Sequence, residues 1–253
     1  MSKFDRYAFS ASPLFDEAKT REVFSHAVSL KTLVIYCYDP RAAEIPQVVA
    51  RLLGDEVFPG QVMLDDSGNR AGSSTTMFPV IVAGGRAIDA LRSITVAQHL
   101  FGIQNIVVVH HSYCGATSFT ADGIIDAYKL EHNADISELY ERGSICIEDY
   151  EASLKRDTAL IRSHAGTPKH VNVFGYFYNI DTGVLTEVVK DKAETILIPA
   201  TSHRGGAINN GTYASIPSQD VLPGRTQPPT WNKPCWSMSE KKGKAQSWAI
   251  PFL

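Results

Sequence analysis

Two short motifs contain the residue types that bind soft metal ions. Cys37 follows one apolar run of residues, and His111 and Cys114 follow another. Apolar runs of this length are typical of buried strands. Two thiolates and one imidazole suit Zn²⁺, and three protein ligands leave a fourth position for water, as in catalytic zinc sites. A buried cysteine alone is usually a small apolar residue, but this combination favours metal ligation.

An acid and a base lie beside the predicted ligands. Asp39 stands two residues after Cys37, so its carboxylate can receive a proton or hydrogen bond from a metal-bound water, or ligate the metal itself. Arg41 has a rigid fork of donors that can hold Asp39 away from the metal. A structural salt bridge is the alternative. Next to a metal site, we favour a catalytic role for the pair.

The elements that must position these motifs alternate along the chain. Apolar runs indicate strands, and three- and four-residue spacing of apolar positions indicates helices. Because ligands gather at the carboxyl ends of parallel strands, the two motifs can converge in an α/β fold with a mainly parallel central sheet flanked by helices. The predicted strands are 32–37, 61–64, 105–111 and a hairpin over 171–189, and the predicted helices are 14–29, 45–54, 90–101 and 147–166.

Composition excludes several classes of protein. With 44% hydrophobic residues, 20% charged residues and a net charge of -3, the chain has no basic excess for binding nucleic acid. We find no apolar run long enough for a membrane span and no signal peptide, so we expect a cytoplasmic protein. The four cysteines are too few for a disulfide scaffold. Cys146 and Cys235 are predicted to be structural.

The two motifs, C-x-D-x-R and H-x-x-C, resemble the signature of the β-class carbonic anhydrases. Residues 92–115 and the stretch FGYFYNIDTGVL at 174–185 are similar to further parts of that family, and GNR at 68–70 looks like the end of its R-N-A-G-N stretch. The double histidine before S-x-C-G is similar to the branch that contains carbonyl sulfide and carbon disulfide hydrolases. The resemblance covers roughly residues 30–190.

The resemblance implies that Cys37, His111 and Cys114 ligate Zn²⁺ and that Asp39 and Arg41 form the catalytic pair. It implies reversible hydration of carbon dioxide to bicarbonate by zinc-bound hydroxide, in a homodimer or a dimer of dimers. One alternative is hydrolysis of carbonyl sulfide or carbon disulfide at the same site. Others are a diverged enzyme acting on a larger metabolite, and a non-catalytic zinc-binding module in which Asp39 fills the fourth position permanently.

Four residues depart from the family pattern or need a separate interpretation. Asp65 and Asp66 stand where the family has Arg-Asn, and they either form a solvated turn or contribute to the site. Tyr113 replaces a small or acidic residue. His110 is predicted to point away from His111 and to be packed and hydrogen-bonded, because strand neighbours alternate between faces.

The composition changes near residue 190. All three tryptophans and most of the thirteen prolines lie beyond it. Proline disfavours long regular elements, whereas tryptophan can anchor a segment to a surface. We therefore predict a zinc domain at 1–190 and an extended arm at 191–253. The arm is expected to pack on the core or the partner subunit, where it strengthens a dimer or shapes the pocket.

Overall fold

A computed structural model describes residues 4–193 of the chain. The predicted arm lies outside the described residues from 194 onward, so its boundary and its role stay predictions. Within residues 4–193, no helix has both the length and the apolar character needed to cross a bilayer.

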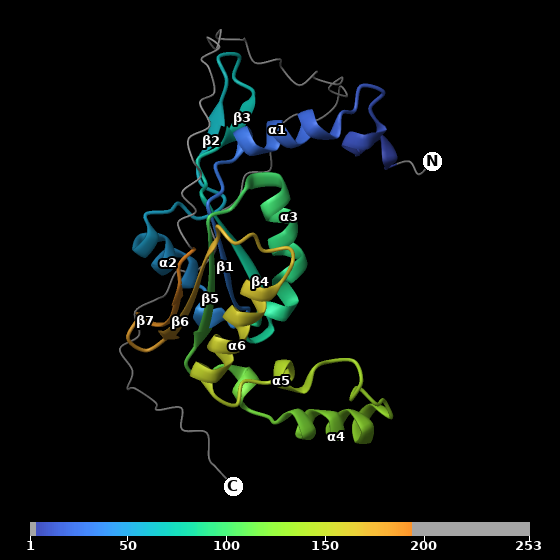
Figure 1. Cartoon of the computed structure of the whole chain (residues 1–253), viewed down its shortest axis with the longest axis vertical. Helices are drawn as coiled ribbons and strands as arrows, with labels where there is room; N and C mark the ends of the chain where they lie inside the picture. The colour runs from blue at the N-terminus through green and yellow to red at the C-terminus, as the bar shows by residue number, and fades with distance from the viewer. Residues whose placement is uncertain (1–3, 194–253) are drawn as a thin grey trace, which may run out of the picture. The chain divides into compact units, whose positions relative to one another are not determined.

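The core of the described part is a five-stranded sheet in the order β4-β1-β5-β6-β7 (Figure 1). The first four strands run parallel, and β7 pairs antiparallel with β6 through a tight hairpin. This confirms the predicted α/β class with a mainly parallel sheet. The strands are β1 (Thr32–Cys37), β4 (Met77–Val82), β5 (Asn105–His111), β6 (Asn172–Asn179) and β7 (Val184–Asp191).

Helices cover both faces of the sheet, which explains why β1 and β5 are apolar at nearly every position. Helices α3 (Leu91–Phe101) and α6 (Tyr150–Ser163) pack on one face, and α2 (Ile45–Leu53) packs on the other (Figure 1). Alternate strand residues enter two separate clusters. Leu33, Ile35, Ile106 and Val108 face α3 and α6, whereas Val34, Tyr36, Val107 and Val109 face α2.

The local signals that predicted these helices are present in the structure. Pro46 lies in the first turn of α2, where its missing N–H is tolerated. Gly54 ends α2 at φ 71°, and Gly102 ends α3 at φ 65°, both in the left-handed conformation that favours glycine. Helix α1 (Glu17–Ala27) and strand β1 also lie within or at their predicted ranges.

Two features differ from the sequence prediction. The predicted strand at 61–64 becomes β2 (Val62–Leu64), which pairs antiparallel with β3 (Arg70–Ser73) in a separate two-stranded sheet. Strand β4 was not predicted, because Pro79 interrupts its apolar run. An edge strand tolerates proline, since only one side of it pairs with the sheet.

The helices α4 (Ala121–His132) and α5 (Arg142–Ile145) were also not predicted. They follow the second motif along the chain and lie near the carboxyl ends of the parallel strands (Figure 1). The segment that contains them therefore flanks the edge of the sheet where the predicted ligands lie.

A glycine pair after β4 brings the chain close to this edge. Gly84 and Gly85 have φ values of 63° and 68°. A Cβ on Gly85 would lie only 2.7 Å from the carbonyl oxygen of Val109 and 3.1 Å from the Cα of Tyr36. Only glycine allows the backbone to pass this near the ends of β1 and β5.

Candidate metal centre

The structure brings the three predicted ligands together at the end of the sheet. Cys37 is the last residue of β1, His111 is the last residue of β5, and Cys114 follows in the next turn; all three are buried. The Sγ atoms of Cys37 and Cys114 are 3.9 Å apart. These two sulfurs and a ring nitrogen of His111 all lie within 4.8 Å of one another. Such a group could hold a metal ion.

The imidazole of His111 is oriented as a metal ligand. Its Nδ1 lies 2.9 Å from the carbonyl oxygen of Ser112, so we assign the proton to Nδ1, which donates to that oxygen. The Nε2 atom is buried and has no hydrogen-bond partner among the described residues. Burial lowers the pKa of His111, which favours the neutral ring. A neutral ring with a free Nε2 lone pair is the form that binds metals.

The two thiols also fit a zinc ion. Burial, together with the neighbouring Cys37, raises the pKa of Cys114 to about 11. The buried Cys114 therefore becomes a thiolate readily only when a cation compensates its charge. Two Zn–S bonds of about 2.3 Å at a tetrahedral angle place the sulfurs about 3.8 Å apart, close to the separation found here. Donor types and spacing thus agree with a Cys₂His zinc centre.

Asp39 and Arg41 form a two-pronged ion pair beside this group. Arg41 donates from Nε to Oδ1 of Asp39 at 3.0 Å and from Nη2 to Oδ2 at 2.7 Å. The backbone N–H of Arg41 also donates to Oδ1 at 2.9 Å. The side-chain hydrogen bond from Arg41 lowers the pKa of Asp39 to about 2, so the carboxylate is ionised at neutral pH.

Arg41 also connects the two motifs. Its Nη2 donates to the carbonyl oxygen of Tyr113 at 2.9 Å. Tyr113 has φ 56°, a left-handed conformation that is uncommon for a bulky residue. The side chain of Tyr113 is exposed. A tyrosine here, in place of the small or acidic residue of the family, therefore changes the surface near the site. The backbone of Tyr113 takes part in the link between the two motifs.

A cavity of about 960 Å³ opens on Cys37 and Asp39. One side is formed by Ala83, Gly84 and Arg86, which follow β4. The rest is largely apolar and comes from the segments that contain the short 3₁₀ helix η5 (Ala87–Ala90), α4 and α5. Its apolar and aromatic lining residues are Ile88, Phe119, Ile124, Tyr128, Ile136, Leu139, Tyr140 and Ile145. None of these lining residues was predicted from the sequence; the one available signal was the glycine pair after an apolar run.

Asp65 and Asp66 lie in the turn between β2 and β3 and are exposed. The carboxylate of Asp65 accepts hydrogen bonds from the backbone N–H groups of Ser67 and Asn69 at 2.9 and 2.8 Å. Neither acid lines the cavity. The two acids therefore form the solvated turn, and the resemblance of residues 68–70 to a family stretch does not bring that stretch to the site.

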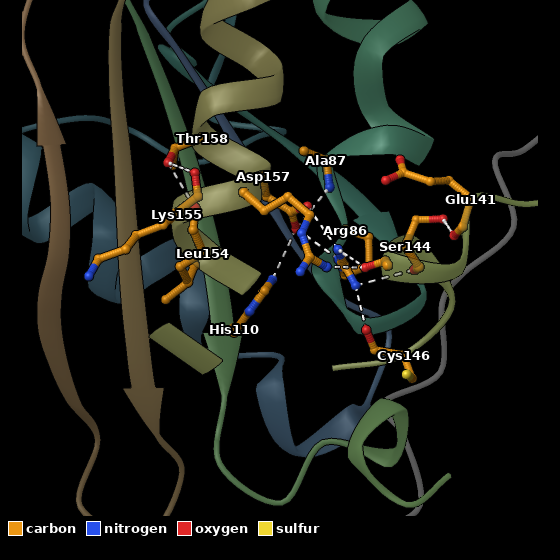
Figure 2. Close-up of polar contacts among 12 residues, drawn as sticks. Arg86, Ala87, His110, Glu141, Ser144, Cys146, Leu154, Lys155, Asp157 and Thr158 are labelled. Carbon is orange, nitrogen blue, oxygen red and sulfur yellow. Dashed lines mark hydrogen bonds and ion pairs between the residues drawn. The ribbon is translucent and has the colours of Figure 1, made fainter. Parts of the chain in front are cut away.

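His110 points away from the ligand group, as predicted from strand alternation. It is completely buried, and its Nε2 lies 3.3 Å from Oδ2 of Asp157 on α6 (Figure 2). Cys146 is buried as well and has a free thiol, but it does not belong to the Cys–His–Cys group.

Relatives in sequence carry names that agree with the two motifs. A carbon disulfide hydrolase of Acidithiobacillus thiooxidans is 30% identical, over 38% of this chain and 56% of that protein. The β-carbonic anhydrase 1 of Mycobacterium tuberculosis is 31% identical, over 40% of this chain and 59% of that protein. The chain thus spans a little more than half the length of these curated relatives. No family model matches the chain.

The solved structures found include a carbonic anhydrase from Streptococcus mutans, with 24% identity and a TM-score of 0.48 over 75% of this chain and 99% of that chain. They also include an apo carbon disulfide hydrolase, with 21% identity and a TM-score of 0.47 over 77% and 93% of the two chains. The sequence relatives confirm the predicted resemblance. The chain is similar in sequence to β-carbonic anhydrases and to carbon disulfide hydrolases.

Proposed function

We propose that this chain is a zinc enzyme of the β-carbonic anhydrase type and that it catalyses the reversible hydration of carbon dioxide. The observation that carries the proposal is the buried group of Cys37, His111 and Cys114, with the Asp39–Arg41 pair beside it. A zinc ion held by these three ligands would lower the pKa of a bound water and supply a nucleophile near neutral pH.

The geometry of Asp39 favours an orienting role over that of a general base. A carboxylate with a pKa of about 2 is a weak proton acceptor at neutral pH. Oδ1 accepts from both Nε and the backbone N–H of Arg41, whereas Oδ2 accepts only from Nη2 and so keeps a further lone pair. Asp39 can therefore accept a hydrogen bond from an attacking water and align it. Because Arg41 holds both oxygens, the arrangement also disfavours Asp39 as a permanent metal ligand.

The cavity supports a small uncharged substrate. Its largely apolar wall gives carbon dioxide a favourable path, whereas ions gain little there. The buried ligand Cys37 lines this cavity, which allows reaction away from bulk water.

Hydrolysis of carbonyl sulfide or carbon disulfide is the second candidate. These molecules present the same kind of electrophilic carbon to the same nucleophile. The apolar lining favours the more apolar sulfur compounds, and three of the curated relatives are named carbon disulfide hydrolases. The cavity volume of about 960 Å³ also lies near the upper end of the usual range for small-molecule sites, which leaves room for a larger metabolite.

We further propose that the chain works as a cytoplasmic homodimer or dimer of dimers. Four large apolar or aromatic side chains near the site are exposed: Tyr38, Tyr113, Leu139 and Tyr140. All of them except Tyr113 line the cavity. Clustered exposed apolar residues are typical of interaction surfaces. Sedimentation analysis at several protein concentrations tests this assembly.

Metal analysis with stopped-flow kinetics tests the function. We expect about one zinc ion per chain, and hydration of carbon dioxide that exceeds hydrolysis of carbonyl sulfide and carbon disulfide. Cys114→Ala should lose zinc and activity, whereas Cys146→Ala, which removes a buried thiol outside the ligand group, should keep both. A folded Cys114→Ala protein with full zinc content would disprove the ligand set. Zinc-loaded wild-type protein inactive on all three substrates from about pH 6 to about pH 9 would favour the non-catalytic module.

A further inference from the structure

Arg86 is a buried arginine whose donors are all occupied. Its Nε and Nη2 donate to the two carboxylate oxygens of Asp157 at 2.9 and 3.1 Å. Its Nη1 donates to the carbonyl oxygens of Ser144 at 3.2 Å and Cys146 at 2.7 Å, and Nη2 also donates to that of Gly143 at 3.1 Å. Figure 2 shows the guanidinium between α6 and the segment around α5. The five N–H groups of an arginine are thus fully used.

The arginine joins two sides of the cavity described above. Arg86 follows the glycine pair after β4 and lines one side. Residues 136–145, together with Cys146, form a second part of the wall, called here the wall segment, which contributes Leu139, Tyr140 and Ile145 to the lining. Three carbonyl groups at the end of this wall segment accept hydrogen bonds from the one guanidinium. The side chain of Arg86 therefore determines how the end of the wall segment lies against the site.

Asp157 carries this link to the strand that bears His111. Its Oδ2 accepts from the backbone N–H of Ala87 at 3.3 Å and lies 3.3 Å from Nε2 of His110, the neighbour of His111 in β5 (Figure 2). The side chains of Arg86 and Asp157 are only 4% and 2% exposed. A buried charge pair with complete hydrogen bonding defines one arrangement of the elements that it joins.

We propose that Arg86 and Asp157 form a positioning pair that holds the wall segment against the cavity and thereby determines how tightly small linear substrates bind at the metal centre. The proposal rests on the function proposed above. Neither residue belongs to the predicted ligands, and neither is assigned to the chemical step. Releasing the three carbonyls would let the apolar side chains of the wall segment move away from the substrate.

The test compares Arg86→Met and Arg86→Lys with a matched control. Lysine keeps a positive charge near Asp157, but it lacks the fork needed to hold the three carbonyls as well. Arg162→Met is the control. Arg162 lies near the C-terminal end of α6, pairs with Asp191 of β7 and does not line the cavity. All proteins are measured as full chains, with zinc for kinetics and with cobalt for spectroscopy.

We expect both Arg86 variants to keep wild-type metal content. Amide hydrogen exchange at residues 143–147 should rise at least about tenfold. The KM for the preferred substrate should rise about tenfold with a smaller change in kcat, because binding contacts in an apolar pocket are lost. The affinity of cobalt-loaded protein for thiocyanate, a linear triatomic anion, should fall in parallel. Arg162→Met should show none of these changes.

The positioning role is wrong if the Arg86 variants are less stable but show wild-type exchange in residues 143–147, wild-type KM and wild-type thiocyanate affinity. The Arg86 pair would then be an ordinary structural ion pair. If the wild-type protein turns over none of the three small substrates, the proposed function fails separately. Exchange and thiocyanate binding still decide the positioning role, since neither readout needs turnover. If Arg86→Met does not fold, Arg86→Lys supplies the same measurements.

Discussion

The protein contains two aspartate–arginine pairs near its candidate site, and they differ in almost every respect. Asp39 and Arg41 are two residues apart, with side chains 14% and 52% exposed. Arg86 and Asp157 are 71 residues apart, with side chains 4% and 2% exposed. The first pair is held within one turn of the chain. The second exists only once β4, α5 and α6 have packed.

This difference separates a chemical role from an architectural one. An exposed pair is screened by water, so it adds little to stability but can orient a carboxylate at a reacting centre. A buried pair loses much hydration, so breaking it leaves an uncompensated charge in the interior. We therefore expect the two pairs to respond in opposite ways to mutation, with activity the sensitive measure for one and stability for the other.

The largest expected effect is on the stability of Arg86→Met. Loss of the arginine leaves Asp157 buried without its main cationic partner, which should lower the free energy of unfolding by about 3–5 kcal/mol. Urea denaturation measures the change. The double variant Arg86→Met/Asp157→Leu removes both charges and should recover much of the loss. If Arg86→Met is as stable as wild type, the buried pair does not contribute to stability in the way predicted here.

Arg41→Met should affect activity more than stability. Without the fork, Asp39 loses its fixed orientation, and we expect kcat/KM to fall about 10–100-fold, as for other residues that orient groups at metal sites. The free energy of unfolding should change by less than about 1 kcal/mol, because the side chain of Arg41 is largely in solvent. Stopped-flow kinetics, zinc analysis and denaturation together check this. Unchanged turnover would exclude the Asp39–Arg41 pair from the mechanism.

The pH dependence of stability offers a smaller but more diagnostic effect. Burial raises the pKa of Asp157, but the hydrogen bonds from His110 and Arg86 outweigh it and leave the pKa below its usual value. Its contribution to stability is thus complete above the unfolded pKa of about 3.9 and is lost as pH falls toward the folded value. Without Arg86, burial should dominate and raise the pKa of Asp157 above its unfolded value. The ionised carboxyl would then destabilise the folded protein at neutral pH, and its protonation would relieve this as pH falls. The stability gap between wild type and Arg86→Met should therefore narrow from pH 7 to pH 4, and a widening gap in urea titrations would contradict this.

The smallest effect is expected for Asp65→Ala. Asp65 caps the turn between β2 and β3 and does not line the cavity. Zinc content should stay the same, and kcat/KM should stay within about twofold of wild type, as for surface positions away from a site. A clear loss of activity would mean that this hairpin approaches the site in the assembled protein. Asp39→Ala, assayed in parallel, shows how large the loss is for an aspartate beside the metal.

Much of the fold and of the candidate site follows from local sequence. Continuous apolar runs predict β1 and β5, because strands covered on both faces are apolar throughout. The spacing of Cys37, Asp39 and Arg41 predicts an ion pair between Asp39 and Arg41 beside the ligand Cys37. Because these residues are close in sequence, the local backbone conformation is enough to bring the two side chains together. Parallel strand ends then predict that Cys37 meets His111 and Cys114, and the structure brings them within ligand distance. The arm beyond residue 193 stays a prediction.

Only the tertiary structure decided the remaining parts of the site. Strand β4 became recognisable once its edge position showed why Pro79 is tolerated. The cavity wall comes largely from the segments of α4 and α5, neither of which was predicted; α5 has only four residues, but α4 has twelve. Arg86 and Asp157 look like ordinary charged residues in the sequence, because nothing local marks them as partners. Their pairing depends on the order of strands and helices in space, and burial by those packed elements makes the pair important.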